Sequence, residues 1–307
     1  MIEDKIYITT SNGIYFIDEK NNEVKNILPS KKLFGIFKRK GYAFFGIAYH
    51  SYSGKVIAAF RERSGTKKHN KPTTDILLYS IDPETHHSEI ITQIKDIHDV
   101  HQIAIRDNLV FITDCGKNRV PVYDLNSEDK ITMINIGEIR DDINHVNALH
   151  VESDFLFIGL NNRGIKESEI LRVAIEDCFD ASHFQVDILD RATKIKLKEI
   201  YHSHDIEKLG EDLVVCSSHK GDLFKVSDSS LLLHSGNWAR GLSVYEDKIL
   251  VGSSKFAERD KRHKENIDGE IKIFELRPPA KLLKTIKLGG AGQVNDILIV
   301  PEKKTGE

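Results

Sequence analysis

The sequence predicts an all-β protein, a six-bladed β-propeller whose blades are four-stranded antiparallel sheets, in a single domain covering residues 1–307. Three observations lead to this fold class. A pair of strand-like runs returns six times, a further strand precedes each pair, and the two ends of the chain carry complementary parts of one unit. A chain of 307 residues has room for one large all-β domain or for two ordinary domains, so the repeats decide between them.

The repeated pair consists of a hydrophobic, β-branched run, a polar turn and a second run of alternating apolar residues that often ends in Asp. Short runs of period two that are separated by turn residues are typical of all-β repeats. The six pairs are 5–10 with 13–18, 55–60 with 75–82, 109–113 with 119–124, 155–159 with 169–174, 213–218 with 221–228, and 249–254 with 269–274.

Each pair is flanked by two further strands. An inner run precedes the pair, and an outer run such as 130–136 or 282–287 follows it. Four strands in about 40–55 residues are what a propeller blade requires. The inner runs are 46–49, 101–105, 147–151, 204–206, 240–244 and, at the far end of the chain, 294–300.

The ends of the chain determine the number of blades. Residues 294–300 supply only an inner strand, whereas the first 28 residues supply a pair and an outer strand without an inner one. Pairing the three N-terminal strands with the C-terminal inner strand closes the ring and removes the exposed sheet edges. Two stacked sandwich domains, the alternative, give no reason for complementary half-blades. Residues 176–199 depart from the pattern and are highly charged, and we expect a short helical insertion there, before the outer strand of their blade.

The composition argues for a soluble globular protein. A formal net charge of −3 gives no reason to expect nucleic acid or an anionic membrane as a partner. No apolar run approaches the ~20 residues that span a bilayer, and the first residues lack the pattern of a secretory signal. Three widely spaced cysteines, Cys115, Cys178 and Cys216, predict no disulfide framework, and we interpret Cys115 and Cys216 as small core residues. Together these features favour a cytoplasmic protein.

Polar side chains recur at the start of successive inner strands. In a propeller these strands line the axis with their N-terminal ends on one face. Aligning them by their apolar runs brings together His101, Asn147 and Arg240, with His204 and Asn295 within about a residue. The period of two residues then adds, on the same side, His145 beside Asn147, Trp238 beside Arg240, His202 beside His204 and Gln293 beside Asn295.

This ring is the predicted functional site. His101, His145 and His204 could act as catalytic acid–base groups or as ligands of a divalent metal ion. Arg240 matches a carboxylate, sulfate or phosphate, and Asn147 and Asn295 could orient such an anion. The remaining binding residues of the prediction are Trp238, His202 and Gln293. The alternative is structural, because propeller channels hold water and buried histidines often bond to backbone carbonyls.

Two long loops between second and third strands, 61–74 and 255–268, are rich in Lys, Arg and His and are predicted to form a cationic lid over the ring. Residues 289–292 are rich in glycine but lack the strand–helix context of a phosphate-binding loop. Asp99 and Asp205 neighbour ring histidines, but no serine stands in the context of a nucleophile elbow.

The strand pattern resembles the six-bladed superfamily that includes NHL-type and gluconolactonase-like propellers. The stretch from Asn144 to Leu149 (NHVNAL) is similar to the His-x-Asn inner-strand motif of arylsulfotransferase-type propellers, a resemblance that implies a catalytic channel histidine. With 239–242 (ARGL) and 251–255 (VGSSK), the same stretch also resembles a family of bacterial propellers of unknown function. Histidines stand where the gluconolactonase-like enzymes carry their calcium ligands, and arylsulfotransferases are typically exported proteins.

Two functions follow as expectations. The first is an enzyme that acts on a small anionic substrate at the ring. The second is a non-catalytic module that binds a ligand or a protein partner on the same face, through rim residues such as Arg259 and Arg262.

Overall fold

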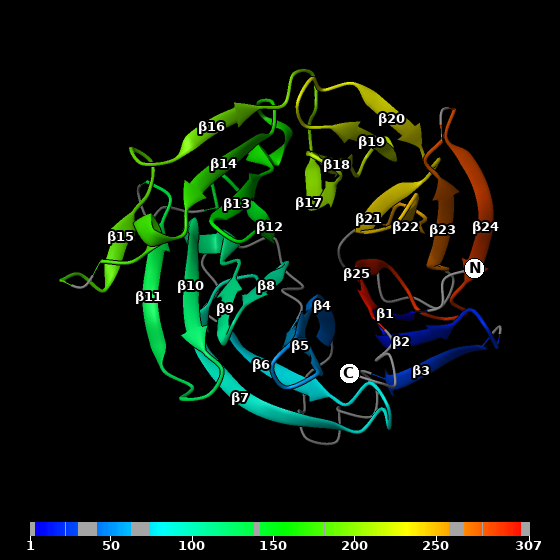
Figure 1. Ribbon diagram of the computed structural model, residues 1–307, viewed down its shortest axis with the longest axis horizontal. Coiled ribbons are helices and arrows are strands. Elements are labelled where there is room, and N and C mark those ends of the chain that lie inside the picture. The colour runs from blue at the N-terminus through cyan, green and yellow to red at the C-terminus, as the bar shows by residue number, and fades with distance from the viewer. Residues whose placement is uncertain are drawn as a thin grey trace.

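The computed structural model describes residues 4–21, 23–29, 42–62, 74–137, 142–180, 182–257, 267–277 and 279–301. Six β-sheets stand around a common axis in this part of the chain, and together they form a closed ring (Figure 1). The predicted six-bladed propeller is therefore confirmed. Each sheet runs outward from an inner strand at the axis to an outer strand at the edge of the ring.

The three blades that follow the N-terminal strands have these elements. One comprises β4 (Tyr42–His50), β5 (Lys55–Glu62), β6 (Thr74–Ile81) and β7 (Ser88–Ile97). The next has β8 (Ile103–Arg106), β9 (Leu109–Ile112), β10 (Arg119–Asp124) and β11 (Lys130–Asn135), with the short 3₁₀ helix η2 (Cys115–Lys117). Then come β12 (Val146–Val151), β13 (Phe155–Leu160), η3 (Asn162–Gly164), β14 (Glu169–Ala174) and β16 (Thr193–Lys196).

The other three blades complete the ring. One holds β17 (Ser203–Leu209), β18 (Asp212–Ser217), β19 (Asp222–Lys225) and β20 (Leu231–His234). Its neighbour holds β21 (Trp238–Tyr245), β22 (Lys248–Ser254), β23 (Glu270–Glu275) and β24 (Lys281–Lys287). The closing blade joins β25 (Val294–Val300) to β1 (Lys5–Thr10), β2 (Gly13–Asp18) and β3 (Glu23–Pro29).

The closing blade has the composition that the chain ends predicted. Strands β25 and β1 pair antiparallel, with Ile6 opposite Ile299 and Ile8 opposite Ile297. Because the ladder continues from β1 through β2 to β3, the first and last described strands lie in one sheet. The pairing gives β1 a neighbour on each side, and β25 becomes the inner strand of this blade at the axis.

Residues 176–199 differ from the predicted helical insertion. They contain one 3₁₀ turn, η4 (Glu176–Cys178), and then β15 (Gln185–Asp187), which pairs parallel with β11 of the preceding blade. Strand β16 then supplies the outer strand of their own blade, as predicted. A segment of one blade thus adds a fifth strand to its neighbour and ties the two together. In the described residues no helix is long and apolar enough to cross a membrane.

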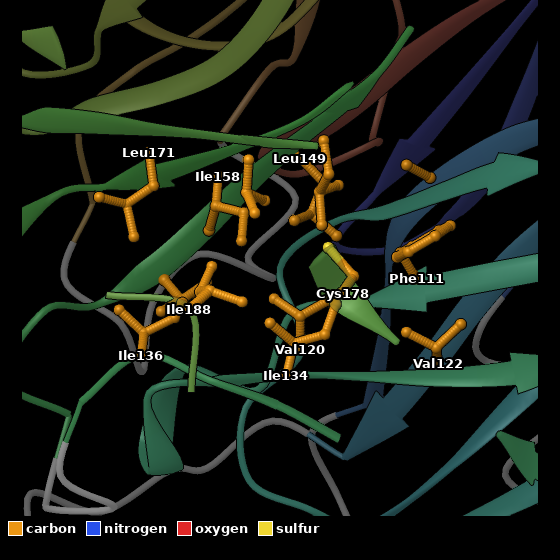
Figure 2. Packing of buried hydrophobic residues seen from close by; sticks show 14 of the residues in the cluster. Phe111, Val120, Val122, Ile134, Ile136, Leu149, Ile158, Leu171, Cys178 and Ile188 are labelled. Atoms are coloured by element: carbon orange, nitrogen blue, oxygen red, sulfur yellow. The ribbon is translucent and has the colours of Figure 1, made fainter. Parts of the chain in front are cut away.

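The hydrophobic core lies between adjacent blades, because each sheet is twisted and packs its faces on its two neighbours. Figure 2 shows one such cluster, in which Phe111, Val120 and Ile134 of one blade meet Leu149 and Ile158 of the next. All three cysteines are buried and free of disulfides. Cys178 lies within this cluster, so it is a core residue.

Local bulges on the inner strands determine what faces the axis. Five of the six inner strands carry an irregular register, where an extra residue opposes the second strand. A bulge turns a side chain out of the regular alternation. The bulged positions are Phe45 with Gly46, Asn147, Asp205, Arg240 with Gly241, and Asn295.

Candidate functional site

The predicted ring residues do meet at the N-terminal ends of the inner strands. The ring centroids of His101 and His145 lie 5.1 Å apart, and those of His101 and His204 lie 6.2 Å apart. Arg240 reaches His204 from the neighbouring blade. The side chains of this axial site are largely buried, at 8% exposure for His101, 7% for His204 and 6% for Arg240.

Each of two histidines has a carboxylate beside it. Nδ1 of His145 lies 2.8 Å from Oδ1 of Asp142, which leaves Nε2 as the nitrogen that can bind a further group. Nε2 of His101 lies 3.9 Å from Oδ1 of Asp99. Asp99 is itself paired with the buried guanidinium of Arg61, which stacks over Phe45 at 3.9 Å. A carboxylate next to a histidine fixes the orientation of the ring and increases its basicity.

A cysteine lies close to His101 and His145. One ligand atom each from His101, His145 and Cys115 lies within 4.8 Å of the others. Cys115 begins η2, directly after the second strand of its blade, and its Sγ donates to the carbonyl oxygen of Val146 at 2.8 Å. Burial and the carboxylates of Asp99 and Asp142 raise the pKa of the Cys115 thiol well above its ordinary value. Among the described residues, the group that could hold a metal ion contains His101 and His145 of the predicted trio, with Cys115 in the place of His204.

His204 makes different contacts. Nη2 of Arg240 lies 2.7 Å from Nε2 of His204, and because a guanidinium only donates, Nε2 must accept. The ring proton therefore sits on Nδ1, which lies 2.7 Å from Oγ of Ser218 and 3.1 Å from the carbonyl oxygen of His202. Burial, followed by the charge of Arg240, lowers the pKa of His204 well below its ordinary value. His204 is a neutral imidazole that holds the guanidinium in place.

This tautomer also decides the role of Ser218. A serine nucleophile needs a basic nitrogen to take its proton. Nδ1 of His204 carries a proton of its own, so Ser218 accepts that hydrogen bond and is not activated by it.

The two predicted carboxamide ligands are engaged with backbone. Nδ2 of Asn147 donates to the carbonyl oxygen of Ser203 at 3.0 Å, and Nδ2 of Asn295 donates to that of Phe44 at 2.6 Å. In each case the acceptor lies on the next inner strand. Their amide nitrogens therefore link neighbouring blades and do not face a ligand.

The carboxamide oxygens of two predicted binding residues, Asn147 and Gln293, lack a protein donor within the described part of the chain. Oδ1 of Asn147 and Oε1 of Gln293 are buried and accept no hydrogen bond from any described residue. Asn147 is 2% exposed and Gln293 3%. Buried acceptors of this kind normally have a partner, either protein or a bound molecule. These two oxygens are the parts of the predicted binding set that could receive a donor from a ligand.

Three acidic residues near the axis were not in the predicted ring. Oδ2 of Asp205 accepts the backbone N–H of Gly241 at 3.0 Å, and Oδ2 of Asp296 accepts that of Ile47 at 3.2 Å. Burial raises the pKa of both carboxyls, and the charge of Asp205 raises that of Asp296 further. Burial and Asp205 raise the pKa of Glu207 to about 8.

Trp238 and His202 belong to an aromatic group at the edge of the site. The rings of His202 and His219 lie 4.0 Å apart, those of His219 and Trp238 4.5 Å, and those of Trp238 and Phe256 5.1 Å. The guanidinium of Arg240 lies 5.6 Å from the Trp238 ring. His202, His219, Trp238 and Phe256 are called the aromatic shelf below.

Several site residues have a left-handed backbone conformation. Asp99, His145 and His202 have φ of +89°, +49° and +55°, and two further site residues, Asp142 and Asp205, are also positive. Non-glycine residues in this region cost free energy. The described turns elsewhere in the chain contain other residues of this kind, such as Asp107 and Glu128.

Sequence reasoning missed Cys115, Asp142, Arg61 and the exposed members of the shelf. The His-x-Asn pattern did point to the right strand, and Asp142 stands three residues before His145, close enough for a hydrogen bond. Arg61 was included in a lid, although it turns inward from the end of β5. Most of that predicted lid, 63–73, lies outside the described residues, as does 258–266 of the second loop with Arg259 and Arg262.

Comparison with known proteins shows the fold alone. A scan of known protein families finds no match, and neither does a search of curated proteins. One similar solved structure is a chain of a nidogen/laminin complex, with a TM-score of 0.64, 10% identity and coverage of 97% of this chain and 98% of that one. Another is a protein from Bacteroides uniformis provisionally described as a 6-phosphogluconolactonase, with a TM-score of 0.54, 11% identity and coverage of 92% and 83%.

Proposed function

We propose that the axial site binds a small anionic ligand beside a divalent transition metal ion, and that the protein is an enzyme that acts on this ligand. The observation that carries the proposal is the grouping of His101, His145 and Cys115, whose ligand atoms lie within 4.8 Å of one another. Such a metal ion polarises an oxygen of a bound anion and activates water.

The donor set fits a metal such as Zn²⁺. Imidazole nitrogens and a thiolate are ligands that Zn²⁺ and its neighbours in the transition series prefer. Three protein ligands leave a coordination position open, as in catalytic zinc sites. Asp142 accepts from Nδ1 of His145 and so leaves Nε2 to the metal. A bound cation would also favour the deprotonated form of Cys115 and offset the effect of burial on this thiol.

Arg240 supplies the charge for an anion. Its guanidinium is held by the neutral ring of His204, so it keeps its full positive charge within a buried site. Metal and guanidinium would approach the anion from different blades. Arg240 and the free oxygens of Asn147 and Gln293 would orient the ligand. His204, for which the sequence predicted an acid–base role, would instead position Arg240.

A second function, a protein-docking module, is favoured by one observation. Four large apolar residues are exposed on the site-bearing face, next to inner-strand starts or second-strand ends: Ile143 at 54%, Ile165 at 85%, Tyr201 at 40% and Phe256 at 62%. The fold neighbour described as a lactonase supports the enzyme instead. The free cysteines agree with the proposed cytoplasmic location.

The test is a titration of the purified protein with Co²⁺ and Zn²⁺. We expect one equivalent of Co²⁺ to bind with a sulfur-to-cobalt charge-transfer band, and Zn²⁺ to displace it. Cys115→Ala and His145→Ala should abolish the band, whereas Cys178→Ala, which changes another buried cysteine, should retain it. Circular dichroism checks that each variant is folded. A folded parent protein without stoichiometric metal, or a band that survives Cys115→Ala, contradicts the metal centre.

A further inference from the structure

The aromatic shelf is placed in register with the axial site. Trp238 stands two residues before Arg240, and His202 stands two residues before His204, on the neighbouring inner strand. His219 follows β18 and Phe256 follows β22, so each comes from the second strand of the same two blades. All four rings therefore lie on the face that carries the proposed metal ligands.

The neighbouring blade is shaped to admit one of these rings. The ring of His202 lies so close to Gly164, at the end of η3, that a Cβ atom at this position would overlap it. Gly164 has a φ of +70°, and His202 has one of +55°. Burial lowers the pKa of His202, which keeps this ring uncharged and suited to stacking. The shelf is thus a built feature of three blades.

Exposure differs sharply within the shelf. Trp238 is 6% exposed, whereas Phe256 is 62% exposed and His219 is also exposed. His219 and Phe256 pack against the buried indole at interplanar angles of 59° and 51°, and they present aromatic surface to solvent. Aromatic surface of this kind is the usual platform for a flat ring of a ligand.

The relation of the shelf to Arg240 defines the shape of the ligand. The guanidinium contacts the shelf at Trp238, its buried member, while the accessible surface belongs to His219 and Phe256. A ligand that reaches both needs a spacer between its flat ring and its anionic group. Nucleoside phosphates have this construction, with a ribose between base and phosphate.

We propose that the axial site takes a nucleoside phosphate, with the base stacked on His219 and Phe256 and the phosphate directed to Arg240. This inference rests on the proposed anion site and names the class of its ligand. Stacking contributes affinity for any base because every base has a π-face. The shelf alone therefore selects nucleoside phosphates as a class and does not distinguish one base from another.

The experiment compares adenosine monophosphate, ribose 5-phosphate and inorganic phosphate on the full chain with one equivalent of Zn²⁺. Trp238 is the single tryptophan of the sequence, so its fluorescence reports directly on the shelf. Calorimetry gives the affinities. We expect adenosine monophosphate to bind about 5- to 150-fold more tightly than ribose 5-phosphate, and to change the tryptophan fluorescence where ribose 5-phosphate does not.

Two variants test whether the preference for adenosine monophosphate comes from the aromatic shelf. Phe256→Ala should lower the preference for adenosine monophosphate and leave the binding of ribose 5-phosphate unchanged. Tyr52→Ala is the matched control, because Tyr52 is a 71% exposed aromatic residue in the turn between β4 and β5, at the opposite face. It should change neither affinity.

Two results would overturn the inference, and they are distinguishable. Equal affinities for the three phosphates, or an equal loss for all of them in Phe256→Ala, exclude base stacking while the anion site stands. If none of the three phosphates binds, the anion site itself fails and the nucleoside inference fails with it.

Discussion

Nη2 of Arg240 lies 2.7 Å from Nε2 of His204, so a buried cation donates to a buried imidazole. Protonation of that nitrogen would break the hydrogen bond and place two positive charges side by side. The contact therefore fixes both the tautomer and the charge of His204.

The first prediction concerns this charge. The ring of His204 should be neutral at pH 6.5, where a free imidazole is half protonated, since burial and Arg240 lower its pKa. Arg240→Met should raise this pKa toward its ordinary value, because the second of these causes is removed. Nitrogen chemical shifts of the imidazole measure both. Arg191→Met, at an exposed arginine, is the control, and a ring that titrates near pH 6.5 in the parent protein would contradict the assignment.

The same shift has a consequence for stability. Because the pKa of His204 is lowered in the folded state, the unfolded chain takes up this proton at a higher pH than the folded protein does. The contribution of His204 to the free energy of unfolding is therefore complete above about pH 6.5 and falls below it, by at most about 1.4 kcal/mol for each pH unit.

The second prediction concerns Asp142. Its carboxylate orients His145 through a 2.8 Å hydrogen bond to Nδ1. Asp142→Asn should weaken Co²⁺ binding about 10- to 100-fold, the usual effect of losing such a partner, while the charge-transfer band of the saturated protein remains. Asp154→Asn, at an acidic residue in the turn between β12 and β13, should leave the affinity unchanged. An unchanged affinity in Asp142→Asn would show that this carboxylate does not support the metal ligand.

The third prediction concerns the link between the last and first inner strands. Nδ2 of Asn295 donates to the carbonyl oxygen of Phe44 at 2.6 Å, and Asn295 is 7% exposed. Asn295→Ala leaves this carbonyl without its donor, so we expect a loss of about 1–3 kcal/mol in the free energy of unfolding. Urea denaturation measures it. Asn126→Ala, in an exposed turn, should cost less than about 0.5 kcal/mol, and equal effects of the two would rule out the link.

The fourth prediction concerns Glu207. Burial and the charge of Asp205 raise its pKa from the ordinary 4.5 to about 8. A raised pKa in the folded state gives a stabilisation that is complete at low pH and is lost as the pH rises toward 8. Glu207→Gln should therefore become more stable relative to the parent protein between pH 5 and pH 8. Glu211→Gln, at an exposed position, should follow the parent protein at every pH.

The fold could be predicted because its signal is repeated. Alternation of apolar residues is local, and six copies of one pattern with complementary ends leave a single way to close the ring. The parallel pairing of β15 with β11 could not be predicted in this way. Gln185–Asp187 is a three-residue strand without an apolar pattern of its own, and its partner lies 52 residues earlier in the chain.

The candidate site could be predicted only in part. Periodicity brought His101, His145, His204 and Arg240 to one face, since all four begin inner strands. It did not show which hydrogen bonds they make. In the sequence Cys115 stands at the end of a strand-like run, as core residues do, and only the neighbouring blade reveals that its sulfur lies near two imidazoles. The bulges that turn Asn147 and Asn295 toward backbone carbonyls likewise depend on contacts between blades.

Closure of the ring by β25 and β1 has a consequence during synthesis. The ribosome makes β1 long before its partner β25. The apolar edge formed by Ile6 and Ile8 therefore waits without its native neighbour until residues 294–300 have emerged. The other five sheets draw each of their inner strands from nearby sequence and can form in order as the chain grows. This sheet therefore forms after the strands of the other five have been made, and the apolar edge of β1 must be kept from non-native pairing in the meantime.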